Sequence, residues 1–497
     1  MSSLKRKTVS GVLWTGMAKM SMQLMLFVVT MILARLLSKE DFGIVGMAAI
    51  ITVAIGMVND KGLGMSIVQK KDVRKSHLST MFWGSLAFGA VLYIISFGAS
   101  FPLAHFFRKE VVQPVVAVIA LGFVIGSFGI VQKSLLTRDM AFKKLAIVEV
   151  IATLSAGGLA IAAALLGWGV WSLVINVLGR DFLAVILLWI VCPWRPAMHF
   201  SKTEFKEYLG FSSNVLANDG ALYLITNADI TIIGRVLGSA ALGVYNLAFN
   251  LVKLPVTRLS GIVAKVVFPA FSSLQNDLNK FKAGYLKAIK YISLVTFPIL
   301  AGLALFSREF ILVVLGEKWL DMMWPLIILT PMAMLKSVGT IKGSVLMAVG
   351  RPDIELKWNL FYLVPLVGAV YVGTRFGLVG VATAYTVLYV LTFPIIQHIT
   401  NRQISVSPFE FARALSKSLL ATLLLVVVGL AARYLLKIVF TLPDVVVLLA
   451  GICIAGLAYI VAIWALDPAV FREFRSLMIR KKSIDPGISI PEVVVSK

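Results

Sequence analysis

Long apolar stretches separated by short polar loops constrain this chain more than any other feature of its sequence. Windows of about twenty predominantly apolar residues, each long enough to cross a bilayer as a helix, recur along the chain and predict fourteen spans. The stretch 311–319 is ambiguous and fits an interfacial or re-entrant segment. Because only helices and closed barrels satisfy their backbone in lipid, we expect an all-α polytopic membrane protein. The expected spans lie near residues 11–36, 43–59, 81–104, 111–131, 145–166, 170–191, 211–237, 242–269, 288–310, 322–349, 356–374, 378–398, 415–436 and 444–466.

The composition supports a lipid environment. Hydrophobic residues make up 59% of the chain and charged residues 14%, whereas soluble domains are about 45–50% apolar and about 25% charged. The formal net charge of +23 would suit either nucleic acid or a membrane. The basic residues form short clusters between the apolar runs, which is typical of cytoplasmic loops. We therefore expect no nucleic-acid partner.

The orientation follows from the basic residues of alternate loops. Most Lys and Arg residues fall in one set of loops, which includes both terminal segments, and this bias predicts that both termini are cytoplasmic. No loop is long enough to form a separate soluble domain. The opposite set of loops carries only Lys39, Arg108, Lys109, Arg308, Lys318, Arg375 and Lys437.

Two segments two hundred positions apart have the same pattern. Residues 35–45 and 235–245 each join a helix end, a short turn and a new helix, with Gly43 and Gly243 at the same offset. This repeat predicts two parallel six-span lobes, 1–205 and 206–400, around a cleft on a two-fold axis along the membrane normal. Two further spans (401–470) and a basic tail (471–497) would lie outside it. A chance similarity of two helix ends is the alternative.

Basic residues at membrane depth suggest a cationic cavity. Span eight carries Asn246, Asn250, Lys253, Thr257, Arg258 and Lys265 on one broad face. Charges inside spans usually face a protein interior or a wet cavity, and an anionic cargo would offset their desolvation. Ion pairing or snorkelling to the surface is the alternative for each. The candidate substrate-binding residues are Lys19, Lys253, Arg258 and Lys336.

Acidic residues inside the spans are fewer. Asp60, Asp219 and Asp229 are candidates for coupling transport to H⁺ or Na⁺, since burial raises a carboxyl pKa toward the working range. Simple pairing of these acids with the basic residues of the next helix is favoured over coupling. For the adjacent Arg180 and Asp181, a structural ion pair is favoured over a site. No other cofactor is expected.

Sequence signatures of catalysis and metal binding are missing. The chain contains no HExxH, GxSxG, P-loop or CxxC motif. Its four histidines do not cluster, and Cys192 and Cys453 predict neither a disulfide framework nor a metal site. We expect a transporter driven by a gradient or by cargo concentration, and no enzyme.

The chain resembles the polysaccharide-transporter (Wzx-like) branch of the MOP flippase superfamily over nearly its whole length. Within that branch it is most similar to the exporters of colanic acid and teichuronic acid. The motifs that carry the resemblance are Val-Ser-Gly11-Val-Leu-Trp14, Ala34-Arg-Leu-Leu-Ser-Lys-Glu-Asp-Phe-Gly43, Asp60-Lys-Gly-Leu-Gly64, Asp229-Ile-Thr-Ile-Ile-Gly234-Arg, Gly243-Val-Tyr245 and Ala348-Val-Gly350-Arg.

This resemblance implies a MOP/MATE-like fold with two six-helix lobes around a central cavity and two C-terminal helices. It also implies a flippase that moves undecaprenyl-pyrophosphate-linked oligosaccharide from the cytoplasmic to the outer leaflet of the bacterial inner membrane by alternating access. Lys19, Lys253 and Arg258 would line its cationic lumen. The implied partners are this polyprenyl-linked oligosaccharide and membrane lipid, together with a polysaccharide polymerase and glycosyltransferases.

Three alternatives stay open at this point. A MATE-like cation-coupled drug antiporter should concentrate acids in its cleft, whereas bases dominate here. A membrane-embedded polymerase or ligase would need a sizeable outer loop to hold sugar acceptors, and this chain has none. A non-transporting scaffold would not require several charges at membrane depth.

Overall fold

The computed structural model describes residues 21–62, 67, 74–203, 223, 227–257, 277–470 and 472. These residues form helices and short connections, with no strand in the described part, which confirms the all-α membrane fold. Nine of the described helices are long and apolar enough to cross a membrane, and a bent helix pair makes a tenth. The expected total of fourteen spans remains a prediction, because several expected spans fall partly outside the described residues.

The chain divides into two compact units, each formed from separate stretches of sequence. Unit 1 comprises Met1–Lys253, Phe310–Met332 and Arg351–Pro394, and unit 2 comprises the remainder. The predicted boundaries at residues 205, 400 and 470 remain predictions.

The described part of unit 1 starts at helix Ser21–Leu36, which packs against small residues. Ala152, Ala156 and Ala160 on α7 are fully buried, and a Cβ on Gly157 would overlap the side chain of Val29. Small residues at such spacing let two membrane helices approach closely. The helices of this part are α2 (Lys39–Gly62), α4 (Lys75–Phe107), α5 (Val112–Ser127), α6 (Ile130–Arg138), α7 (Phe142–Leu165) and α8 (Val170–Val191).

The two repeated turns meet in unit 1. Gly43 lies on α2, and Gly243 lies on α12 (Gly238–Pro255), which follows α11 (Ala228–Val236). A Cβ on Gly43 would overlap the carbonyl oxygen of Ser239, and a Cβ on Gly243 would overlap that of Lys39. The contact is reciprocal, because each glycine faces the residue four positions before the other. This is the geometry expected of a parallel repeat related by a local two-fold axis.

The ambiguous stretch 311–319 is helical and closes the end of helix Ser21–Leu36. It forms a π-helical turn, η2 (Ile311–Leu315), and then the 3₁₀ helix η3 (Glu317–Met322), which leads into α16 (Met323–Gly339). Trp319 is fully buried, and its Nε1 donates to the Ala34 carbonyl oxygen at 2.8 Å. Lys318 Nζ donates to the carbonyls of Arg35 and Leu37 at 2.8 and 2.6 Å. These side chains satisfy carbonyls that a helix C-terminus leaves without partners.

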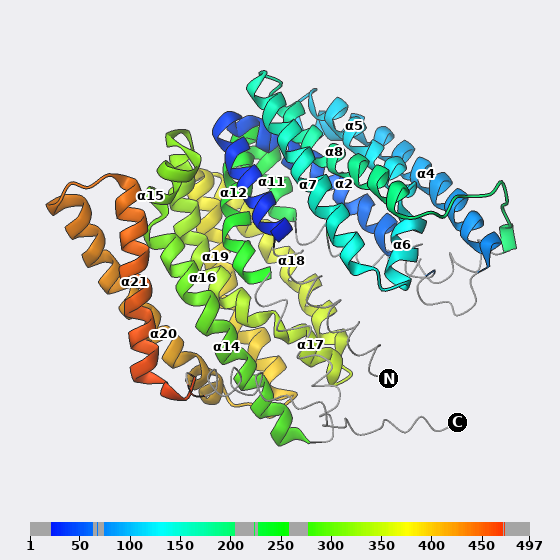
Figure 1. Ribbon diagram of the computed structural model, residues 1–497. Coiled ribbons are helices and arrows are strands. Elements are labelled where there is room, and N and C mark those ends of the chain that lie inside the picture. Colours follow the sequence, from blue (N-terminus) through cyan, green and yellow to red (C-terminus); the bar gives the residue numbers. More distant parts are fainter. Residues whose placement is uncertain are drawn as a thin grey trace. The chain divides into compact units, whose positions relative to one another are not determined.

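Unit 2 is built around α14 (Leu278–Leu305). Helix α20 (Pro408–Tyr434) packs against α14 on one side and against α21 (Asp444–Leu466) on the other (Figure 1). Ser293 and Ser418 are hydrogen-bonded at 2.9 Å between α14 and α20. The remaining helices among the described residues are α15 (Ser307–Phe310), α17 (Ile341–Ala348), α18 (Pro352–Thr374), α19 (Gly377–Arg402) and η4 (Leu435–Val439).

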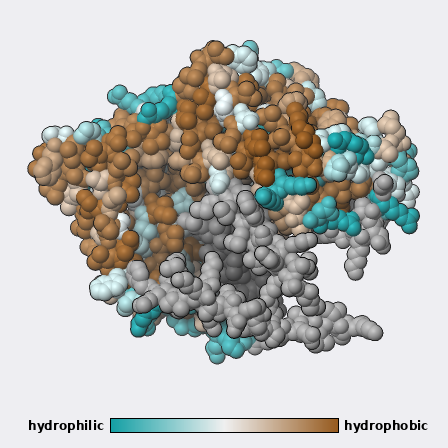
Figure 2. All heavy atoms as spheres, in the orientation of Figure 1, coloured by the Kyte–Doolittle hydropathy of each residue, from teal (hydrophilic) through white to brown (hydrophobic). Residues whose placement is uncertain are grey.

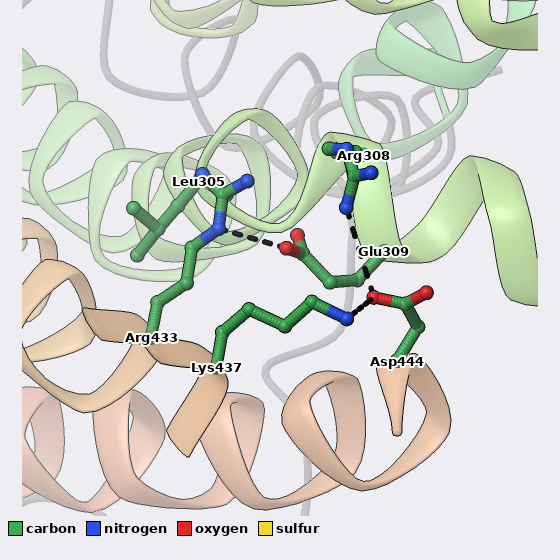
Figure 3. A network of polar contacts seen from close by, with 6 residues as sticks. All are labelled: Leu305, Arg308, Glu309, Arg433, Lys437 and Asp444. Atoms are coloured by element: carbon green, nitrogen blue, oxygen red, sulfur yellow. Dashed lines mark hydrogen bonds and ion pairs between the residues drawn. The ribbon is translucent and has the colours of Figure 1, made fainter. Parts of the chain in front are cut away.

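A network of charged side chains joins α20 and α21 to the end of α14 (Figure 3). The Glu309 side chain is completely buried, and Arg433 Nε donates to its Oε1 at 2.8 Å. Asp444 pairs with Lys437 at 2.6 Å and with Arg308 at 3.8 Å. Five charges from three neighbouring segments therefore compensate one another where α14 ends.

The outward surfaces of the described helices are largely apolar. Figure 2 shows hydrophobic residues over most of the visible described face, with hydrophilic residues gathered mainly in patches. On α21, Leu457 and Trp464 are 63% and 65% exposed. Contiguous exposed apolar surface on this scale is stable in lipid and not in water.

Candidate functional site

The structure describes three of the seven candidate residues in full. Asp229 and Lys253 lie in unit 1, whereas Lys336 lies in the last turn of α16, in unit 2. Asp60 belongs to the end of α2, with a side chain outside the described part. Lys19, Asp219 and Arg258 also fall outside the described residues.

Asp229 is a buried carboxylate at the start of α11. Its residue is 1% exposed and occupies the first turn of the helix, where the helix dipole favours a negative charge. The hydroxyl of Tyr245, a fully buried residue of α12, donates to Asp229 Oδ2 at 3.0 Å. Burying a carboxylate at membrane depth is unfavourable unless donors surround it. Tyr245 supplies such a donor.

A ladder of side chains on α12 links Asp229 to Lys253. Tyr245, Phe249 and Lys253 follow one another at intervals of four residues and so share one helix face. The rings of Tyr245 and Phe249 stack with centroids 5.8 Å apart. The Lys253 Nζ lies 5.9 Å from the centre of the Phe249 ring, a cation–π geometry. The ladder thus has a carboxylate at one end and an exposed ammonium at the other.

Two more helices of unit 1 contribute tyrosines to this region. Tyr385 of α19 is 5% exposed and meets the Phe249 ring edge-on at 6.0 Å. Tyr362 lies on α18, which packs against α11, the helix that carries Asp229. We call Asp229, Tyr245, Tyr362, Tyr385 and Lys253 the Asp229 site.

The described part of the predicted polar face covers Asn246, Asn250 and Lys253 on α12 and Thr257 just beyond its end. Asn250 Nδ2 donates to Asn246 Oδ1 at 3.1 Å, and Lys253 and Thr257 lie further along the helix as exposed residues. Lys336 on α16 is half-buried and engaged with neighbours. Because it belongs to unit 2, its relation to the Asp229 site stays a prediction.

The Asp229 site can bind small charged species. Its carboxylate and phenol oxygens can hold a proton or a small cation, and Lys253 can donate to an anion. In the described part of the chain, no group of three His, Cys, Asp or Glu residues is arranged to hold a metal. Asp229 and Lys253 are among the residues that the sequence predicted, whereas the tyrosines are not. The four-residue spacing of Tyr245, Phe249 and Lys253 was the available signal.

Comparison with known proteins identifies the family. Residues 32–324, more than half of the chain, match the family described as "Polysaccharide biosynthesis protein". The teichuronic acid biosynthesis protein TuaB of Bacillus subtilis (strain 168) is 30% identical over 70% of this chain and 72% of its own length. The chain belongs to this family. It is a member of the polysaccharide-transporter branch of the MOP superfamily, as the resemblance implied.

A second relative and a solved structure agree with this assignment. The lipopolysaccharide biosynthesis protein WzxC of Escherichia coli (strain K12) is 29% identical over 70% of this chain and 71% of its own length. The lipid II flippase MurJ, in an inward closed conformation, superposes with a TM-score of 0.70 at 15% identity. That likeness covers 93% of this chain and 100% of the other and concerns the fold. The protein is a multi-pass membrane transporter for polysaccharide biosynthesis and not an enzyme.

Proposed function

We propose that this transporter flips an undecaprenyl-pyrophosphate-linked oligosaccharide from the cytoplasmic to the outer leaflet of the bacterial inner membrane. The observation that carries the proposal is the Asp229 site, a buried acid linked by an aromatic ladder to an exposed lysine within a polysaccharide transporter. Such charges inside spans are unfavourable unless function requires them.

The roles of the two charged ends follow from their chemistry. Lys253 would contact the pyrophosphate or an acidic sugar of the cargo, together with Lys19, Arg258 and Lys336. Asp229 would take up H⁺ or Na⁺ and so couple the gradient to alternating access, with Asp60 and Asp219 as further candidates. The excess of basic residues in one set of loops supports cytoplasmic termini.

The partners of such a flippase would act before and after it. Glycosyltransferases must assemble the lipid-linked oligosaccharide at the cytoplasmic face, and a polysaccharide polymerase must consume it at the outer face. Membrane lipid surrounds the transporter throughout.

The decisive experiment follows lipid-linked oligosaccharide in cells that lack this protein. The proposal predicts accumulation in the cytoplasmic leaflet and loss of surface polysaccharide, both reversed by the wild-type gene. Lys253→Ala should fail to restore export, whereas Lys144→Gln, at an exposed position on α7, should restore it. Normal leaflet distribution with unpolymerised units outside would overturn the proposal and point to polymerisation or ligation. Unchanged oligosaccharide with impaired efflux of cationic drugs would point to an antiporter.

A further inference from the structure

A second polar region of unit 1 lies apart from the Asp229 site. A cavity of about 610 Å³ lies among α2, α5, α6, α7 and α8. Cavities of roughly 300–1,000 Å³ hold small molecules of drug or cofactor size. No residue of the Asp229 site lines this cavity.

Four charged side chains line the cavity as two loose pairs. Arg180 Nη2 lies 3.3 Å from Asp181 Oδ1, and both residues are in the middle of α8. Lys133 Nζ on α6 lies 3.6 Å from Glu149 Oε1 on α7. All four side chains are between 37% and 62% exposed. These contacts are longer than the 2.7–2.9 Å of a strong charge-assisted hydrogen bond.

The sequence analysis favoured a structural ion pair for Arg180 and Asp181. The pair is present, but its surroundings indicate more than charge compensation. Neighbouring residues on a helix do not face each other, so both side chains are left directed partly into the cavity. An ion pair with a purely structural role is expected to be closely packed by its neighbours. This pair instead borders a cavity.

The cavity also lies at a sharp bend between two helices. Helices α5 and α6 meet at an angle of 47°, the geometry of a broken span or a re-entrant loop. Gly126, in the last turn of α5, and Gly129, between the two helices, line the cavity. Broken helices at membrane depth are tolerated where they line a protein cavity, and in transporters they mark binding sites. An added Cβ on Gly126 would meet no atom within 4 Å. This glycine keeps space open and does not serve close helix packing.

We propose that this cavity binds a phosphate-bearing polyol headgroup. The phosphate would take the place of the carboxylates beside Arg180 and Lys133, and the hydroxyls would donate to Asp181 and Glu149. A simple anion or cation would satisfy only half of the four groups and face repulsion from the other half. A ligand with both an anion and hydroxyl donors satisfies all four.

Two sources have this chemistry: the sugar-phosphate end of the transported lipid and the headgroup of phosphatidylglycerol in the bilayer. The site lies outside the Asp229 site, and its occupancy does not depend on the direction of transport. Binding is therefore measured separately from export.

The test uses the full-length protein in nanodiscs of phosphatidylcholine, titrated calorimetrically with glucose 1-phosphate. Arg180→Gln and Lys133→Gln should each weaken binding by at least about tenfold, as expected for losing a charge-assisted contact. Lys144→Gln, an exposed position of α7 outside the cavity, should bind like the wild type. In parallel, native mass spectrometry of protein from phosphatidylglycerol nanodiscs counts retained lipid.

A filling variant tests the cavity without altering a charge. Gly126→Leu places a side chain in the open space and should abolish binding of the probe. Gly158→Leu on α7 is its matched control, because a Cβ there also meets nothing within 4 Å and the position lies outside the cavity. Its binding should equal that of the wild type.

The outcomes distinguish three cases: a site for the transported headgroup, a site for a bilayer lipid, and no site. Binding of glucose 1-phosphate that both Arg180→Gln and Gly126→Leu remove, with no retained phosphatidylglycerol, would assign the site to the transported headgroup. Retention of phosphatidylglycerol that the same variants lose, without sugar-phosphate binding, would assign it to a bilayer lipid. Binding of neither, or binding of either that both variants leave unchanged, would overturn the proposal.

Discussion

Gly43 and Gly243 face each other's helices in a reciprocal contact, although two hundred residues separate them in sequence. Each lacks a Cβ where the carbonyl oxygen of Ser239 or Lys39 approaches. The hydrogen bond of the Ser239 hydroxyl to Glu40 Oε1, at 3.2 Å, reinforces the same contact. Two segments with one sequence pattern thus form a close backbone contact between α2 and α12.

This contact predicts a selective effect of added side chains. Gly43→Leu should lower the free energy of unfolding by about 1–3 kcal/mol, the range for overpacking a filled site. Gly243→Leu should do the same, because the backbone approach is equivalent. The measurement is thermal unfolding of the purified protein in detergent.

Gly98→Leu on α4 is the control for this pair, since a Cβ there meets nothing within 4 Å and the position is exposed. This variant should change the midpoint temperature of unfolding no more than an ordinary surface substitution does. Equal midpoints for Gly43→Leu and Gly98→Leu would mean that the contact contributes nothing in the folded protein.

The sequence predicted the repeat because glycines at equal offsets are visible without structure. It could not predict that the two turns touch, since sequence spacing carries no information on which helices come into contact. Similarly, Asp229 was recognisable as an acid within a span, whereas Tyr362 and Tyr385 come from helices more than a hundred residues away. The cavity beside Arg180 was missed for another reason: glycines that keep space open look the same in sequence as glycines that permit close packing.

Removing one partner of the Arg433–Glu309 pair should be more damaging than removing both. Arg433→Leu leaves the buried Glu309 carboxylate without its closest cation and should reduce stability by about 3–5 kcal/mol. The double variant Arg433→Leu/Glu309→Leu should recover most of that loss, because hydrophobic replacement of a buried ion pair is often neutral. Thermal unfolding of the two variants and of Glu309→Leu completes the double-mutant cycle.

The exposed pair of Arg351 and Asp353, 3.0 Å apart, provides the comparison. Arg351→Leu should change stability by less than about 1 kcal/mol, as for most surface ion pairs. If the Arg433→Leu and Arg351→Leu variants unfold alike, the network in Figure 3 does not hold α20 against α14.

The Tyr245 hydroxyl should stabilise the folded protein through its hydrogen bond to Asp229. The packing of the Tyr245 ring should contribute separately. Tyr245→Phe keeps the stacking on Phe249 and removes the donor to Asp229 Oδ2, which should lower stability by about 1–3 kcal/mol. In an Asp229→Asn background the same substitution should have a smaller effect, because a neutral acceptor needs the donor less. Tyr371→Phe, at a position 56% exposed, should be silent in both backgrounds. Equal losses in the two backgrounds would contradict the coupling.

Protonation of Glu40, which pairs with Lys109, should lower the stability of the protein at acid pH. Their 2.5 Å hydrogen bond, which joins residues beyond the ends of their expected spans, holds the pKa of Glu40 below its ordinary value of 4.5. On acidification the unfolded chain therefore takes up the proton first. The stabilisation is present above pH 4.5 and is lost as the pH falls through the lower folded value. Because both side chains are 41–47% exposed, the effect should stay below about 1 kcal/mol.

Unfolding of the wild type and of Glu40→Gln between pH 3 and pH 7 measures this contribution. The variant should be the less stable protein at pH 7, and the difference should shrink toward zero at the acid end, where both carry a neutral side chain. High salt should shrink it as well, since the pair is screened. A Glu40→Gln difference that persists at the lowest pH would show that the amide disturbs the turn itself and that charge is not the cause.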